Sequence, residues 1–151
     1  MRRLAGALLA RDLCAARPVV VLSGNDIEHA TLALACLYAG IPFAPISPAY
    51  CDGHDNFRRL SHVARSLTPG LIFASDADRC ARAASSVFAG IEFITVRQSA
   101  DCLTAVHPRL DELWSTPETE RAEQAFLVRV PTLLRNSCSR LTSANRICAA
   151  S

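Results

Sequence analysis

The sequence contains no lysine: all 16 of its basic residues are arginines. Without lysine, a chain cannot form a Schiff base with a carbonyl substrate or hold a phosphate with an ammonium group. Acids and arginines are interspersed, and the formal net charge is only +2. Because nucleic-acid binding needs gathered basic residues, we expect no nucleic-acid partner.

Cysteine is plentiful, but the spacings typical of metal sites and disulfide frameworks are missing. No Cys-x-x-Cys pair and no zinc-type spacing occurs among the seven cysteines, which are Cys14, Cys36, Cys51, Cys80, Cys102, Cys138 and Cys148. Seven is also an odd number. We interpret these residues as small, buried, apolar side chains in a reducing compartment, which predicts a cytoplasmic location.

Long hydrophobic runs are also absent. No segment approaches the roughly 20 apolar residues that cross a membrane, and Arg11 and Asp12 interrupt the N-terminal apolar run before it reaches signal-peptide length. We therefore expect no membrane partner. The chain has 151 residues, 50% of them apolar and 20% charged, which is enough for one domain with a buried core.

The apolar pattern alternates between helical and extended segments. Residues 3–15 predict an amphipathic helix, and the unbroken apolar run at 19–22 is typical of a strand covered on both faces. Further strands are predicted over 43–46, 71–74 and 92–96, with helices between Asn25 and Gly40, over 56–67 and over 77–88. Because strands and helices alternate, we predict an α/β fold: a partial, doubly wound, mostly parallel sheet with helices on both faces.

The helix after the first strand carries the clearest boundary signals. Asn25 can cap its free N–H groups, with Glu28 three residues later as in a capping box. Gly40 is placed to end the helix in a left-handed conformation. Between them one stripe of apolar residues recurs at helical spacing, namely Ile27, Ala30, Leu34 and Leu37. Prolines and an Asp-Gly step predict a loop over 45–53.

The character of the chain changes after Thr116. Residues 117–151 lack a strand and end in a polar, cysteine-bearing run, so we divide the chain into an α/β layer over 1–116 and an irregular tail over 117–151. Just before that boundary, Leu110, Leu113 and Trp114 predict a short helix or turn that packs on the layer.

Three groups of residues could carry chemistry. Thiol, imidazole and carboxylate ligands occur together at Cys51, Asp52, His54 and Asp55, but their close spacing fits no known metal geometry and favours a solvated loop. The turn Ser23-Gly24-Asn25 lies where α/β sheets often bind anions. Its single glycine is too few for a dinucleotide site, so a helix cap and a tight turn explain it.

The histidines form the third group, with His29, His62 and His107 spread along the chain. No serine or cysteine nucleophile occurs in an identifiable elbow, so no triad is predicted. The sequence therefore assigns no catalytic, cofactor-binding or metal-binding residue.

Three strings carry a resemblance to a known family: LAGALLARDL, RPVVVLSGNDIEHATLALACLYAGIPFAPISPAY and LSHVARSLTPGLIFASDADR. In this order, from about Leu4 to Arg79, they resemble the N-terminal part of AMP-forming acyl- or aryl-CoA synthetases, most of all the feruloyl-CoA synthase type. The combination of SGN, EHA, YAGIP and SPAY makes the resemblance specific. It implies the N-terminal α/β subdomain of an adenylate-forming enzyme.

Complete members of that family join a carboxylate to the α-phosphate of ATP and pass the acyl group to coenzyme A, with Mg²⁺ balancing the phosphate charge. Their phosphate-binding loop, Thr-Ser-Gly-Ser-Thr-Gly-x-Pro-Lys, is absent from this chain. The resemblance thus implies a truncated carboxylate–CoA ligase with an aromatic or fatty acid substrate, inactive alone and without a cofactor of its own. Whether the chain is itself an enzyme stays open.

The tail suggests an origin for the truncation. A shifted reading frame of VRVPTLLRNSCSR permits Gly-Pro-Asp-Thr-Ile-Ala-Lys-Phe-Leu-Phe-Thr-Ser, which resembles the segment before the family's phosphate loop. We hypothesise a frameshift near residues 125–130, and we expect a missing segment before LAGALLA as well. Two alternatives remain: a non-enzymatic α/β binding or interaction module, perhaps paired with a separately encoded remainder of the synthetase, and the product of a pseudogene.

Overall fold

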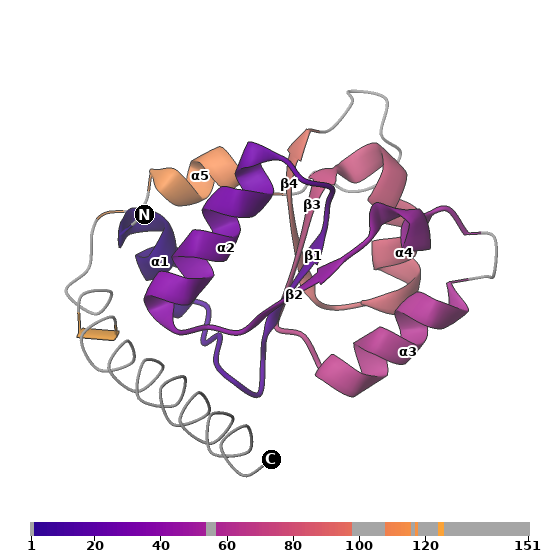
Figure 1. Cartoon of the computed structure of the whole chain (residues 1–151), viewed down its shortest axis with the longest axis horizontal. Helices are drawn as coiled ribbons and strands as arrows, with labels where there is room; N and C mark the ends of the chain where they lie inside the picture. The colour runs from indigo at the N-terminus through magenta and orange to yellow at the C-terminus, as the bar shows by residue number, and fades with distance from the viewer. Residues whose placement is uncertain (1, 54–56, 98–107, 116, 118–123, 126–151) are drawn as a thin grey trace, which may run out of the picture.

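The computed structural model describes residues 2–53, 57–97, 108–115, 117 and 124–125. They form one sheet with helices on both faces (Figure 1). In chain order the elements are α1 (Arg2–Leu9), β1 (Val19–Leu22), α2 (Ile27–Ala39), β2 (Phe43–Ile46), the 3₁₀ helix η1 (Pro48–Cys51), α3 (Arg58–Leu67), β3 (Leu71–Asp76), α4 (Ala77–Val87), β4 (Glu92–Arg97) and α5 (Leu110–Trp114). Most of the predicted tail, 117–151, lies outside the described residues, so its division from the layer stays a prediction.

The four strands of this sheet are parallel and lie in the order β2-β1-β3-β4. Val19 of β1 lies opposite Phe43 on one side and opposite Leu71 on the other. All four residues of β1 are buried. A central strand covered on both faces has no polar position, which explains the unbroken apolar run and confirms the predicted parallel sheet.

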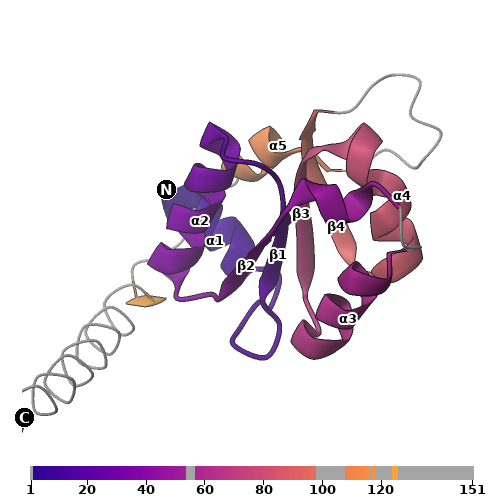
Figure 2. The same ribbon diagram turned by 45° about the vertical axis from the view of Figure 1, so that its right-hand side comes forward.

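Two hydrophobic cores lie on opposite faces of the sheet. Figures 1 and 2 show α1, α2 and α5 over one face and α3 and α4 over the other. Because successive side chains of a strand point to opposite faces, Val19 and Val21 join the first core, whereas Val20 and Leu22 join the second. The connections therefore wind in both directions from the centre of the sheet, and the predicted doubly wound α/β fold is confirmed.

The first helix is shorter than the predicted segment 3–15, because α1 ends at Leu9. Asp12 then adopts a left-handed conformation with φ of 52°, which ends the helical course. Arg11 stabilises this end of the helix: its Nη1 donates to the Ala7 carbonyl at 2.9 Å, and its Nε donates to Glu92 Oε2 of β4 at 2.9 Å.

The cap and the packed face of α2 differ from the sequence interpretation. Asp26, not Asn25, is the N-cap, and its Oδ1 accepts from the His29 backbone N–H at 2.7 Å. The face that packs consists of Leu32, Ala35, Cys36 and Ala39. Small side chains on that face let α2 lie close to the sheet and to α1. The predicted end of the helix is confirmed, since Gly40 is left-handed with φ of 66°.

The segment 45–53, predicted as a loop, is more regular than its prolines suggest. Pro45 is part of β2, which is an edge strand, where a missing N–H is tolerated. Pro48 begins η1, and the Ser47 side chain accepts from the Ala49 N–H at 3.3 Å. The remaining predicted strands and helices agree with the structure to within two residues.

Candidate functional site

The carboxyl ends of β1 and β3 are the first place where this fold could bind a ligand. The chain leaves β1 toward β2 through α2 on one face of the sheet, and it leaves β3 toward β4 through α4 on the other. Neighbouring strands whose connections diverge in this way open a crevice at their carboxyl ends, which is where open α/β sheets bind ligands. Ser23 and Ser75 lie at these two ends.

Hydrogen bonds within the chain already occupy most of the polar groups at this crevice. Ser75 Oγ donates to Asp26 Oδ2 at 2.5 Å, while the other carboxylate oxygen of Asp26 caps α2. The Gly24 carbonyl oxygen lies 2.8 Å from His29 Nδ1, where the imidazole N–H can donate to it. Within the described part of the chain, Ser23 Oγ is the one buried side-chain oxygen or nitrogen without a hydrogen-bond partner.

The charges at this edge oppose the anion site that the position of Ser23-Gly24-Asn25 suggested. The Asp26 carboxylate accepts from an N–H group of the first turn of α2, and Glu28 adds a second negative charge there. Because a helix N-terminus holds an anion through those free N–H groups, α2 has little left to offer one. The arrangement serves to fasten α2 to the end of β3.

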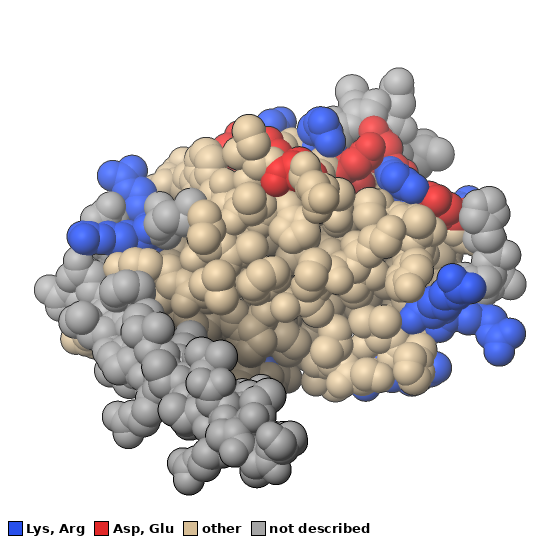
Figure 3. All heavy atoms as spheres, viewed as in Figure 1, with Lys and Arg blue, Asp and Glu red and all other residues tan. Residues whose placement is uncertain are grey.

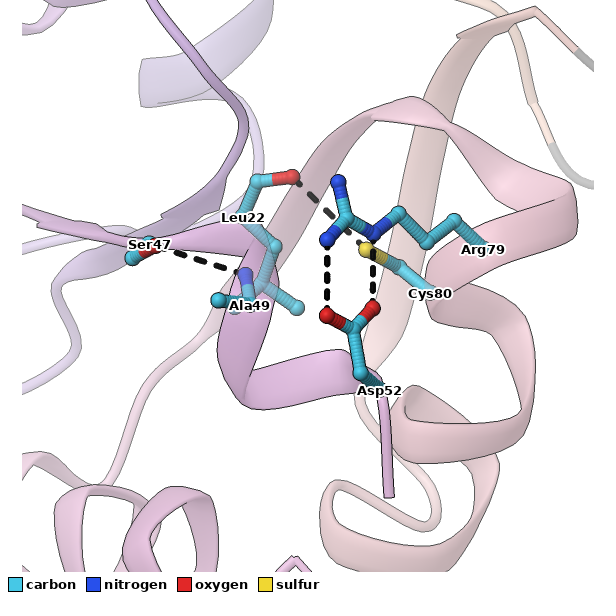
Figure 4. A network of polar contacts seen from close by, with 6 residues as sticks. All are labelled: Leu22, Ser47, Ala49, Asp52, Arg79 and Cys80. Carbon is cyan, nitrogen blue, oxygen red and sulfur yellow. Dashed lines mark hydrogen bonds and ion pairs between the residues drawn. The ribbon is translucent and has the colours of Figure 1, made fainter. Parts of the chain in front are cut away.

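A second cluster lies beside the same edge, between η1 and α4 (Figure 4). Arg79 Nε and Nη2 donate to the two carboxylate oxygens of Asp52, each at 2.8 Å. Cys80, the next residue, is buried and lies with its Sγ 3.8 Å from the Leu22 carbonyl oxygen. These contacts tie the segment after β2 to the first turns of α4.

Cys51 and Cys80 belong to the same hydrophobic core beside this second cluster, and a hydrogen-bonding interaction between their thiols sets the direction in which each pKa shifts. That bond lowers the pKa of Cys51 and so does the positive charge of Arg79, against the opposing effect of burial. The same bond raises the pKa of Cys80, and burial acts in the same direction. The Arg79 pKa is raised, above all by its bond to Asp52.

The cluster of Cys51, Asp52, His54 and Asp55 that the sequence offered as a set of metal ligands is divided by the fold. Cys51 is buried and contacts Cys80, whereas Asp52 pairs with Arg79; His54 and Asp55 lie outside the described residues. Across the described segments there is no group of three or more His, Cys, Asp or Glu residues that could hold a metal ion. Sequence reasoning missed Arg79 and Cys80, because both lie far from the loop along the chain.

The outer surface of α3 forms a third candidate, an open and basic groove of about 930 Å³. Its walls are lined by Tyr50, Arg58, Arg59, Ser61, His62, Val63 and Arg65. None of these residues is acidic, and Figure 3 shows basic side chains gathered at this end of the molecule. The groove can attract anions.

The other two predicted histidines are not close to this groove. His29 lies at the start of α2 and contacts Gly24, and His107 is outside the described residues. Leu110 and Leu113 of α5 are buried as predicted, whereas Trp114 is 47% exposed. Asp26 contacts both Ser75 and His29, but it accepts from the backbone N–H of His29, whose ring faces the Gly24 carbonyl oxygen, so these three residues do not have the arrangement of a triad.

Comparison of the sequence with models of protein families and with curated proteins gives no match. Comparison of the fold with solved structures gives several matches. One is the luciferase-like enzyme from the nonluminescent mealworm Zophobas morio, with a TM-score of 0.59 and 18% sequence identity over 80% of this chain. A red-emitting luciferase from Phrixothrix hirtus has a TM-score of 0.59 and 21% identity over 75%. Amide bond synthetase McbA from Marinactinospora thermotolerans has a TM-score of 0.51 and 17% sequence identity over 78% of this chain. The fold is that of the N-terminal part of adenylate-forming enzymes.

The match covers only a small part of each of these larger proteins. This chain spans 27% of the mealworm enzyme, 20% of the luciferase and 22% of the amide bond synthetase. At such identities the likeness concerns the fold alone. It confirms the predicted α/β layer and shows that its fold is similar to part of these enzymes; the feruloyl-CoA synthase type is untested.

One surface of the layer exposes several large apolar side chains to solvent. Ile27, Leu34 and Leu37 of α2 are 80%, 55% and 52% exposed, and Figure 3 shows that the middle of this side of the molecule has few charges. β2, which is an edge strand of the sheet among the described residues, lies between α2 and α3 on the same side (Figure 1). In the described part of the chain no helix is long and apolar enough to span a membrane.

Proposed function

We propose that this chain is the N-terminal structural layer of an AMP-forming carboxylate–CoA ligase that uses an aromatic or fatty acid, of the feruloyl-CoA synthase type. By itself it does not catalyse ligation. The fold and the family order of the three sequence strings support this proposal. A cytoplasmic location, with no nucleic-acid or membrane partner, belongs to the same proposal.

The observation that carries the proposal is the outward apolar stripe of α2. A helix that completes a protein's surface turns polar side chains to water. Ile27, Leu34 and Leu37 are exposed here instead, beside a strand that forms an edge of the described sheet. An apolar surface of this kind marks an interface. The chain spans between a fifth and about a quarter of the enzymes it resembles, so the remainder of such an enzyme is the natural cover.

The cofactors of complete ligases do not fit the residues of this layer. ATP needs N–H groups and cations around its phosphates, but the N-terminus of α2 is capped by Asp26 and carries Glu28, and the chain has no lysine. The arginines that line the α3 groove are exposed to solvent. We therefore assign ATP, Mg²⁺ and coenzyme A to the complete enzyme and not to this layer.

Acid-dependent exchange between ATP and pyrophosphate tests the proposed inactivity. The purified chain is incubated with ATP, Mg²⁺, labelled pyrophosphate and a panel of aromatic and fatty acids, with a complete adenylate-forming enzyme as positive control. We expect no exchange above the level without acid. Exchange with any carboxylic acid would overturn the proposal of an inactive layer.

The exposed face of α2 also supports a second candidate, a non-enzymatic module that pairs with a separately encoded remainder of the synthetase. The nucleotide sequence around and beyond codons 120–151 distinguishes the two. A separate downstream frame that begins near the phosphate loop, and whose product co-purifies with this chain, favours the module. A single interrupted frame without a translated product favours a frameshifted relic.

A further inference from the structure

The strongest unassigned feature of the molecule is the contact between Cys51 and Cys80. Cys51 is the last residue of η1, and Cys80 lies in the first turn of α4. Both belong to the same hydrophobic core, and they are 3% and 1% exposed. The pKa of each thiol responds first to the other thiol, so the two side chains are neighbours in this core.

The neighbouring residues hold the two backbones in this position. Asp52 follows Cys51 in the chain, Arg79 precedes Cys80, and the two form a bidentate ion pair at 2.8 Å (Figure 4). A bidentate arginine–carboxylate pair fixes orientation as well as distance. The ion pair therefore lies beside the two thiols, at the place where η1 meets α4.

The pKa values of the two thiols shift in opposite directions. The Cys80 thiol can donate its proton to the Cys51 sulfur or to the Leu22 carbonyl oxygen, which lies at 3.8 Å. Together with the charge of Arg79, this donation lowers the pKa of Cys51, whereas the pKa of Cys80 is raised. Cys51 is thus the sulfur that becomes a thiolate first, and the thiolate is the form that reacts.

We propose that Cys51 and Cys80 form a reversible disulfide when the chain meets a hydroperoxide. The Cys51 thiolate attacks one peroxide oxygen, so an S–O bond forms, the O–O bond breaks, and the released hydroxide takes a proton to become water. Cys80 then loses its proton and attacks the Cys51 sulfur, so the S–S bond forms and the hydroxyl of the sulfenic acid leaves as a second water. Two thiols are oxidised, one hydrogen peroxide is reduced, and a dithiol reverses the reaction.

The disulfide would close a loop of the chain that contains α3 and all of β3. Because a cross-link restricts the unfolded chain, the oxidised protein unfolds at a higher temperature than the reduced protein. The effect is independent of ligase activity, since it needs only the native contact between η1 and α4.

Peptide mapping of the folded, full-length chain tests the proposal. Reduced protein is treated with an equimolar amount of hydrogen peroxide, blocked by alkylation and digested. We expect a peptide that joins Cys51 to Cys80, which disappears after treatment with dithiothreitol. The matched control is Cys36, which is also buried but lies in the core on the other face of the sheet; it should remain a thiol under the same conditions.

Single substitutions separate the two roles. In Cys80→Ser we expect Cys51 to stop at the sulfenic acid and to be labelled by dimedone, whereas in Cys51→Ser we expect Cys80 to stay a thiol. Circular dichroism, with Cys→Ala versions as a second pair, verifies that each variant folds. A linked peptide that forms only in denaturant, or Cys80 oxidation that is unchanged in Cys51→Ser, would refute the proposal.

Discussion

Asp26 accepts two hydrogen bonds that connect different parts of the molecule. One carboxylate oxygen accepts from the His29 N–H at 2.7 Å, and the other accepts from the hydroxyl of the buried Ser75. The residue therefore joins the start of α2 to the end of β3. The sequence identified a capped helix here, but it could not distinguish Asn25 from Asp26, because both side chains are good caps and only the position of Ser75 selects the second.

Substitution of Asp26 by alanine removes both interactions. We expect the free energy of unfolding, measured by urea denaturation, to fall by about 1–3 kcal/mol, because a cap is lost and a buried hydroxyl loses its partner. Asp76→Ala is the matched control: Asp76 caps α4 through one exposed bond to the Arg79 N–H at 3.2 Å, so a loss of about 0.5–1 kcal/mol is expected. Equal losses would contradict the bridging role of Asp26.

Cys36 connects stability to pH. Burial raises its pKa from 9.0 to about 12, so the folded chain keeps the neutral thiol where the unfolded chain would ionise. The stabilising effect is complete below pH 9 and is lost as pH rises from about 9 to 12, with a slope near 1.4 kcal/mol per pH unit. We expect Cys36→Ala to show a shallower decline of unfolding free energy over that window. If the unfolding free energies of the wild type and of Cys36→Ala declined in parallel over this window, the role of Cys36 would be contradicted.

At the scale of elements, the strands were the easiest part of the fold to predict. A strand buried on both faces must be apolar throughout, so the run Val19–Leu22 identified both the strand and its parallel neighbours. The face of α2 was harder to predict, because that helix is apolar nearly all round. The small side chains of Ala35, Cys36 and Ala39 pack inward, while larger ones stay outside.

The connection between α1 and β1 contacts the start of β3 at Gly70. A Cβ atom at this glycine would lie 2.7 Å from Leu13 Cδ2 and 3.1 Å from Arg17 Cβ. We expect Gly70→Ala to lower the free energy of unfolding by about 1–3 kcal/mol, because the packed segment must shift. Gly24→Ala is the control, since no atom lies within 4 Å of its added Cβ; a change within about 0.5 kcal/mol is expected.

Chemical denaturation of both glycine variants provides the measurement. The comparison isolates close packing from the general effect of adding a methyl group to a glycine. A loss in Gly24→Ala as large as that in Gly70→Ala would show that the close approach at Gly70 is not the cause.

At the scale of the whole molecule, the exposed stripe of α2 governs behaviour in solution. Large apolar side chains beside an unpaired strand favour association of one chain with another. We expect the purified chain to associate as its concentration rises, and Leu34→Gln combined with Leu37→Gln to shift it toward monomer. Light scattering coupled to gel filtration gives the mass.

The control for this experiment is a leucine on the inner side of the same helix. Leu32 is buried in the core, so Leu32→Ala should lower the free energy of unfolding by about 2–5 kcal/mol without improving solubility. A wild-type chain that is monomeric at all concentrations and melts cooperatively would count against the proposal that this layer lacks its cover.

Local apolar patterns and motifs close together in the chain were sufficient to predict the alternation of strands and helices, the parallel sheet and the resemblance to adenylate-forming enzymes. The three-dimensional packing was needed to show which face of α2 is buried, which acid caps it, that Asp52 pairs with Arg79, and that Cys51 and Cys80 share one core. Such pairings join residues far apart in sequence, and only the packing of α4 against η1 brings them within reach of each other.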